Sequence, residues 1–186
     1  MPSFFLPLLA CVLASIGGRD QRLVALLSAR LGASHALLIA CWIVSVLTSV
    51  LAAFAGVTLA AMMPPAGKTM LVAFALLFAA GELAWPIRKR DPAEPTRSLF
   101  AITLVLAAHQ IGDAARFLVF AFAVASGVPV LVALGGAIGS GAALTLGWAL
   151  GASLHQRLPL RLIRIAIAVL LMIAAIWTGL TARGIL

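Results

Sequence analysis

The sequence predicts an all-α, polytopic membrane protein in which six transmembrane helices form two inverted three-helix repeats. Its 186 residues are 64% hydrophobic and only 10% charged, and the mean hydropathy of +1.19 exceeds what a soluble domain requires. The apolar residues form long unbroken runs, which indicate helices, because the strands of a β-barrel would alternate apolar and polar residues. The two halves of the chain also match each other in one ungapped register.

Six segments are long enough to cross the hydrocarbon core, for which a helix needs about 20 mostly apolar residues. They cover residues 3–30, 35–61, 69–87, 98–125, 129–154 and 160–181, and polar residues interrupt the first and the fourth. Residues 62–68 form a Pro/Gly turn. Residues 88–97, with two prolines and six charges, form a solvated cytoplasmic linker between the first repeat (1–87) and the second (98–186).

A shift of 95 residues aligns the two halves without a gap. It places four turn-forming residues on residues of the same type: Gly17 on Gly112, Gly32 on Gly127, Gly56 on Gly151 and Pro64 on Pro159. Because each half contains an odd number of spans, the second half must be inverted relative to the first. Inverted repeats are typical of secondary transporters, whose binding sites lie near the midplane on interrupted helices.

The basic residues predict how the chain lies in the membrane. One side carries eight of them: Arg30, Arg88, Lys89, Arg90, Arg97, Arg157, Arg161 and Arg164. The other side carries Lys68 and Arg183, so the first side should be cytoplasmic and both termini should lie outside. We expect a multi-pass protein of the inner (plasma) membrane. Its net charge of +8 reflects this topology and does not indicate nucleic-acid binding.

A polar stretch interrupts the fourth segment where the middle of a membrane helix would lie. Its side chains surround Gly112 and comprise His109, Gln110, Asp113 and Arg116. An ionisable group at the bilayer centre costs about 2.5–3.5 kcal/mol on insertion scales, so it is interpreted as functional.

The equivalent place in the first half carries a second polar stretch, which includes Ser15, Arg19 and Asp20. One interpretation ends the first helix at Gly18 and leaves the charges in a cytoplasmic loop. The other interrupts the helix as in the second half, and the shared register favours it. Helices related by a pseudo-twofold axis would bring Arg19 and Arg116 close to Asp113 and Asp20, and we expect the charges to pair across the repeats.

With these motifs the sequence resembles the Gdt-type calcium/manganese–proton exchangers of the lysine-exporter superfamily. Members of that family carry Glu-x-Gly-Asp-(Lys/Arg)-(Thr/Ser) in the first helix of each three-helix half. The matching residues here are 15–20 (Ser-Ile-Gly-Gly-Arg-Asp) and 110–115 (Gln-Ile-Gly-Asp-Ala-Ala). The resemblance covers nearly the whole chain. It implies the six-helix inverted-repeat fold and a cation site built from the motif carboxylates.

The motifs depart from the family pattern at three of four carboxylate positions, which are Ser15, Gly18 and Gln110 in this chain. The resemblance implies that Asp113 carries the cation or proton, with Gln110, Ser15 and Asp20 as oxygen ligands, and that Asp113 and Gln110 are the candidate metal ligands. Hard divalent cations take six or more oxygen ligands, so a single family carboxylate beside two arginines predicts a weakened site. Arg19, Arg116 and His109 are assigned to pairing or gating, and a proton relay through His109 is an alternative.

We therefore expect secondary transport of a small cation, most simply Mn or Ca exchanged for protons, with the two halves rocking about the motifs. No enzymatic, cofactor or nucleotide motif is visible, so the driving force would be the proton gradient. Two alternatives stay open. One is a transporter of an anion or an amino acid, which two midplane arginines would suit. The other is a non-transporting membrane partner protein whose core charges only pair with one another.

Three further features complete the predictions, and the first two concern packing. Small residues recur every four positions in the fifth segment and should allow another helix to approach closely; they are Gly135, Gly139, Ala143, Gly147 and Gly151. Cys11 and Cys41 lie inside apolar runs and should be free, buried thiols. Glu82, late in the third segment, is assigned to the membrane interface, with a place along the pathway as the alternative.

Overall fold

We describe a computed structural model of the chain over residues 1–86, 98–151 and 160–185; the predicted linker 88–97 lies outside these ranges. The described residues form helices and no strands, which confirms the all-α prediction. The elements are α1 (Pro2–Ser15), α2 (Arg19–Leu31), α3 (His35–Ala61), α4 (Pro65–Ala84), α5 (Leu99–Ile111), α6 (Ala114–Ser126), α7 (Pro129–Leu150) and α9 (Leu160–Ala182). Among them α3, α4, α7 and α9 are long and apolar enough to cross a membrane on their own.

The two predicted interruptions are present as sharp bends. The angle between α1 and α2 is 61°, that between α5 and α6 is 54°, and each pair together is long enough for one span. Counting each pair as one span gives up to six spans among the described residues. In the first bend Gly17 adopts φ +71°, a left-handed conformation that glycine tolerates without strain.

Local sequence signals explain where several helices begin. The hydroxyl of Ser34 accepts a hydrogen bond from the amide of Leu37 at the start of α3, and Ser98 caps α5 in the same way. The predicted turn 62–68 is shorter than expected, because α4 already begins at Pro65. Proline is favoured in the first helical position, where its fixed φ fits and its missing N–H is not needed.

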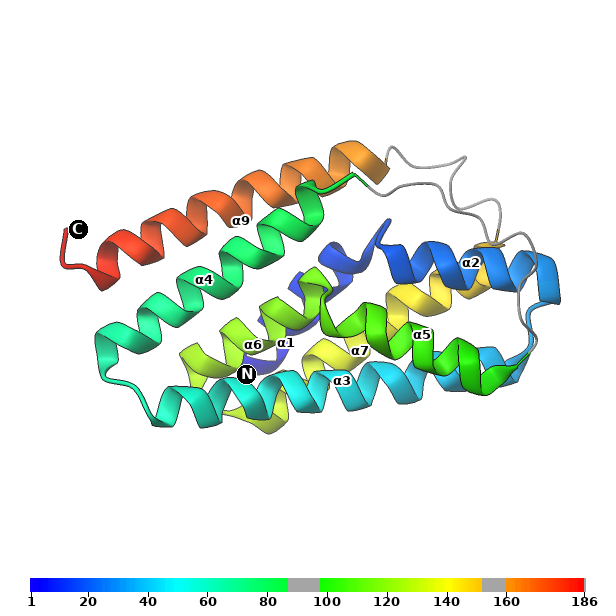
Figure 1. Cartoon of the computed structure of the whole chain (residues 1–186), viewed down its shortest axis with the longest axis horizontal. Helices are drawn as coiled ribbons and strands as arrows, with labels where there is room; N and C mark the ends of the chain where they lie inside the picture. The colour runs from blue at the N-terminus through cyan, green and yellow to red at the C-terminus, as the bar shows by residue number, and fades with distance from the viewer. Residues whose placement is uncertain (87–97, 152–159, 186) are drawn as a thin grey trace.

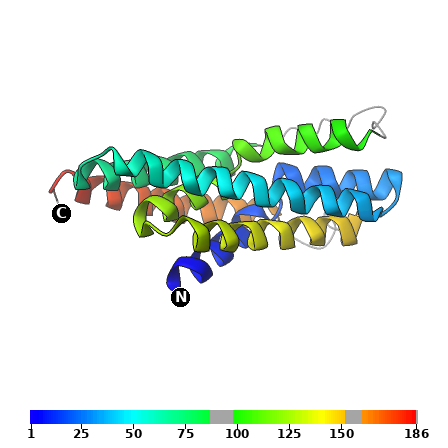
Figure 2. The same ribbon diagram turned by 90° about the horizontal axis from the view of Figure 1, so that it is seen from below.

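The two halves pack against each other along most of their length (Figure 1). The three most extensive helix–helix interfaces join α4 with α9, α1 with α7, and α3 with α7. In Figures 1 and 2, α3 and α7 lie side by side and run in opposite directions, and Figure 1 shows the same for α4 and α9. These are the helices that the 95-residue shift equates, so the arrangement is consistent with inverted repeats.

The small-residue stripe of α7 packs against α1. A Cβ atom added to Gly135 would lie 2.3 Å from the carbonyl oxygen of Phe4, and one added to Gly139 would lie 2.4 Å from that of Leu8. Real Cβ atoms essentially never approach backbone this closely, so these positions require glycine. The predicted close helix contact is confirmed, and it places α1 beside the core of the second half.

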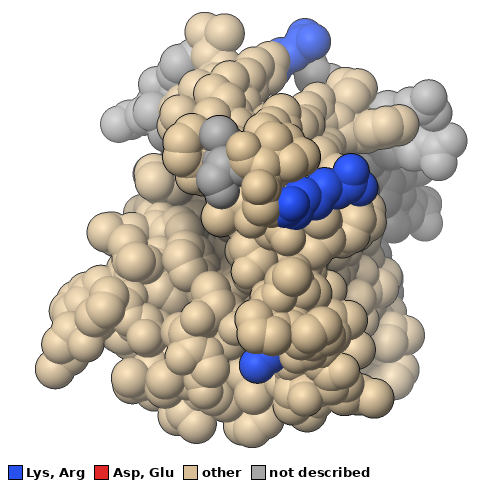
Figure 3. Space-filling view, turned by 90° about the vertical axis from the view of Figure 1, so that its left-hand side faces the viewer, with Lys and Arg blue, Asp and Glu red and all other residues tan. Residues whose placement is uncertain are grey.

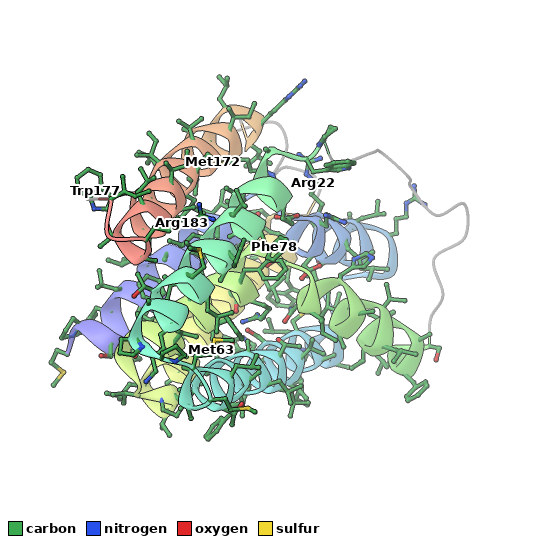
Figure 4. All side chains as sticks on the ribbon, turned by 60° about the vertical axis from the view of Figure 1, so that its left-hand side comes forward. Arg22, Met63, Phe78, Met172, Trp177 and Arg183 are labelled. Atoms are coloured by element: carbon green, nitrogen blue, oxygen red, sulfur yellow. The ribbon has the colours of Figure 1, made fainter. Side chains whose placement is uncertain are left out.

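The surface and the thiols agree with a membrane-embedded bundle. Large apolar side chains cover its outside, and Figure 4 shows Trp177 projecting outward from α9. Figure 3 views the molecule from the left-hand side of Figure 1. Among the described residues, this face carries scattered Lys or Arg side chains and no Asp or Glu. Cys11 and Cys41 are free and buried, as predicted.

Candidate functional site

The two breaks meet at a small cavity inside the bundle. Its volume is about 10 Å³, roughly the space that one ordered water occupies. Both halves contribute to its lining, which comprises Ser15, Gly18, Asp20, Gln21, Gln110, Asp113, Arg116, Ser140 and Leu144. The structure therefore brings the two polar motifs together, although they lie 95 residues apart in the sequence.

The helix ends at the breaks explain how these residues reach the cavity. Gly18 is the N-cap of α2 and Asp113 is the N-cap of α6, and these positions are equivalent in the repeat register. Asp20 lies in the first turn of α2. The N-terminus of a helix carries a partial positive charge, which favours the Asp113 carboxylate at the start of α6 and the Asp20 carboxylate in the first turn of α2. The side chain of Gln21 folds back, and its Oε1 atom accepts a hydrogen bond of 2.7 Å from the Gly17 amide.

Arg116 is the positive charge of the cavity, and it is only 3% exposed. Its guanidinium donates hydrogen bonds to Ser49, to Gln110 Oε1 at 3.0 Å and to Ser140 Oγ at 2.8 Å. Gln110 Oε1 also accepts a bond of 2.8 Å from the hydroxyl of Thr48. The amide oxygen predicted as a cation ligand is thus already engaged twice in this conformation.

Residues on α3 and α7 contribute a part of this network that the motifs do not contain. Ser45 and Ser140, which are equivalent under the 95-residue shift, approach each other with their Oγ atoms 2.6 Å apart. Contact between equivalent residues is what a pseudo-twofold axis produces at the point through which it passes. The signal in the sequence was the spacing of Ser45, Thr48 and Ser49, which places three hydroxyls on one face of an apolar helix.

Two carboxylates face the cavity, one from each half. Asp20 is 7% exposed and Asp113 is 9% exposed. The Oδ1 atom of Asp20 lies 3.6 Å from His109 Nδ1, which is too long for a hydrogen bond. This oxygen and the hydroxyl of Ser15 are buried without a hydrogen-bond partner among the described residues. The cavity thus contains oxygen atoms that are available to a ligand.

Arg19 does not lie where cross-repeat pairing would place it. Its Nε atom lies 3.3 Å from Glu82 Oε1, and about half of its side chain is exposed. Successive residues of a helix point about 100° apart, so Arg19 faces α4 whereas Asp20 faces the cavity. Glu82 is buried, and so is Arg164, which the sequence assigns to the cytoplasmic basic residues.

The described residues contain no group of three or more His, Cys, Asp or Glu side chains that could hold a metal ion. A cation bound here would therefore need hydroxyl, amide, backbone or water oxygens beside its carboxylates.

A bundle of apolar helices with a buried polar cavity between two broken spans has the architecture of a secondary transporter. Residues 98–185 match the family model described as "Divalent cation/proton antiporter GDT1". The match covers the second half of the chain and supports the Gdt-type family, and the apolar helices are those of a multi-pass membrane protein. The searches of curated proteins and of solved structures give no match.

Proposed function

We propose that this protein is a secondary transporter that exchanges a divalent cation, Mn or Ca, for protons at a site weaker than the family pattern would form. The family match supports the reaction class. The single observation that carries the proposal is that Asp20 and Asp113 line the same cavity from opposite halves. The site therefore has two carboxylates rather than the one that the motif comparison leaves.

Charge balance supports a cation rather than a purely structural ion pair. With both carboxylates ionised and Arg116 protonated, the formal charge of these three groups is −1. Hydroxyl and amide groups hold the Arg116 guanidinium in place, so neither carboxylate is needed as its hydrogen-bond acceptor. A cation and protons would compete for the same carboxylate oxygens, and this competition is the minimal requirement for exchange.

The cavity also indicates what binding requires. Asp113, Asp20 and Ser15 would supply oxygens directly, and Gln110 could join only after releasing Thr48 or Arg116. A hydrated ion cannot fit into about 10 Å³, so the ion must either lose most of its water or bind after the breaks have moved apart. Both requirements lower the affinity.

Reconstituted vesicles test this proposal. We would impose a gradient of Mn or Ca and follow internal pH with a trapped dye, comparing the parent with Asp113→Asn and Asp20→Asn. Asp91→Asn, which makes the same chemical change in the linker outside the described residues, is the matched control. We expect cation-driven proton movement in the parent and the control and none in the two site variants. Parent-like flux in both site variants would refute the proposal.

One feature favours an anionic substrate instead. The N-termini of α2 and α6 begin at residues that line the cavity, and Arg116 lies beside them. Such helix ends bind anions in other transporters. In the same vesicles, proton or anion movement that chloride, phosphate or an amino acid stimulates, and that Mn and Ca do not, would favour this alternative. If the folded parent moves neither protons nor any of these substrates, the result would favour a non-transporting protein.

A further inference from the structure

The first helix break is held from outside the cavity by the ends of α4 and α9. The Arg164 guanidinium lies 3.3 Å from Glu82 Oε1, and both side chains are almost fully buried, at 4% and 6% exposed. Arg164 also donates to the main-chain oxygen of Glu82 at 3.0 Å and to that of Gly17 at 3.4 Å. The ion pair between α4 and α9 is therefore bonded directly to the break.

Packing reinforces this contact. A Cβ atom added to Gly17 would lie 2.9 Å from Leu160 Cβ, so Leu160 covers the break closely. Leu160 and Arg164 are one helical turn apart on α9 and act on the same glycine. Arg19, the first residue of α2, adds a third tie, because its Nε atom lies 3.3 Å from the same Glu82 carboxylate. We call Glu82, Arg164 and Leu160 the clamp.

The second break has no equivalent of the clamp. No described atom lies within 4 Å of the Cβ position at Gly112, which is exposed and not left-handed. Under the 95-residue shift, Glu82 corresponds to Trp177 and Arg164 corresponds to Thr69, and these two residues cannot form an ion pair. Among the described residues, only the first break is tied to the ends of α4 and α9 in this way, so the two halves are constrained differently.

We propose that Glu82 and Arg164 are positioning residues that fasten the first break and thereby close the cavity on the side of the α4 and α9 ends. They touch no cavity oxygen themselves. They act through Gly17, which lies between Ser15 and Asp20, two residues of the cavity lining. Opening the cavity on this side requires the clamp to release Gly17. The link to a transport cycle rests on the proposed function, whereas the closure itself does not.

The closure is testable with a single thiol in the cavity. In a Cys11→Ala, Cys41→Ala background, Ser15→Cys provides the reporter, and its labelling by a charged, membrane-impermeant maleimide is followed from each side of vesicles. Glu82→Gln and Arg164→Gln should raise the labelling rate from the clamp side about tenfold, because the open state becomes more populated. Arg161→Gln changes an exposed arginine in the same turn of α9 and should leave the rate unchanged.

Glu82→Gln leaves the buried charge of Arg164 without its carboxylate partner and can prevent folding, whereas in Arg164→Gln the Glu82 carboxylate keeps Arg19. The double variant Glu82→Gln/Arg164→Gln removes both charges and so avoids this problem. If it elutes as a monodisperse peak and labels as slowly as the background, the proposal is overturned; faster labelling from the clamp side alone supports it. Equal acceleration from both sides would indicate general loosening and would also overturn it. No transported ion is needed for this readout, so it separates failure of the clamp from failure of the exchange activity.

Discussion

Replacing Ser140 by alanine measures how strongly the buried network holds Arg116. The substitution removes the acceptor that lies 2.8 Å from the Arg116 guanidinium and the hydroxyl that lies 2.6 Å from Ser45. In the variant, the Ser45 hydroxyl still donates a hydrogen bond of 3.0 Å to the carbonyl of Ala137, and Arg116 keeps its bonds to Ser49 and Gln110. The main loss is therefore one hydrogen bond to a charged donor.

Two general values bound the size of this loss. A hydrogen bond to a charged group contributes about 1.5–3 kcal/mol to stability, whereas interhelical bonds in membranes average about 0.6 kcal/mol. Because the donor is charged and buried, we expect Ser140→Ala to lower the free energy of unfolding by about 2 kcal/mol. Ser28→Ala is the matched control, since Ser28 donates a neutral interhelical bond of 2.6 Å to the carbonyl of Trp148. It should lower that free energy by about 0.6 kcal/mol.

Unfolding by titration with dodecyl sulfate in mixed micelles, followed by circular dichroism, measures both free energies. The difference between the two serine variants reports the charge of Arg116, because the substitution is the same. If Ser140→Ala destabilises the protein no more than Ser28→Ala does, the guanidinium does not depend on this network. The charge balance proposed for the cation site would then lose the support that it takes from the bond between Ser140 and Arg116.

Two further predictions follow from the packing. Gly139→Val should strongly reduce the yield of folded protein, because its Cβ would lie 2.4 Å from the carbonyl oxygen of Leu8. Gly81→Ala should fold normally, because no described atom lies within 4 Å of the added Cβ. The two variants are compared by the monodispersity of their gel-filtration peaks. Cys11 and Cys41, both 0% exposed, should resist N-ethylmaleimide in the native protein, and two thiols should react after denaturation in dodecyl sulfate. Rapid modification of the native protein would contradict the buried core.

The helices were predictable because each depends on a local property of the chain. The long apolar run 35–61 becomes α3 (His35–Ala61) with the same ends, since a capping serine precedes it and a Pro/Gly turn follows it. The bends were predictable from glycine and charge in the middle of apolar segments. The start of α4 was placed too late, because Pro65 was interpreted as part of a turn although proline also begins helices.

The partners of buried charges were not predictable, because packing between distant helices selects them. Arg164 lies one turn into α9, where a count of basic residues in the sequence assigns it to the cytoplasmic side, yet α4 brings Glu82 to within 3.3 Å of it. Arg19 and Asp20 are neighbours in α2, and their side chains therefore point in directions about 100° apart. As a result Arg19 contacts Glu82, whereas Asp20 faces the cavity. No periodicity within one segment contains this information.

The position of Asp20 explains how a chain that lacks three motif carboxylates can still present two. In the repeat register Gly18 corresponds to Asp113, so the first half lacks the carboxylate at its N-cap. Asp20 lies two residues later, and in a continuous helix a shift of two residues would turn a side chain by about 200°, away from the original direction. Here the helix is broken, and residue 18 is an N-cap with extended backbone rather than a helical residue. The break therefore frees the first turn of α2 from the direction of α1, and the displaced carboxylate reaches the same cavity.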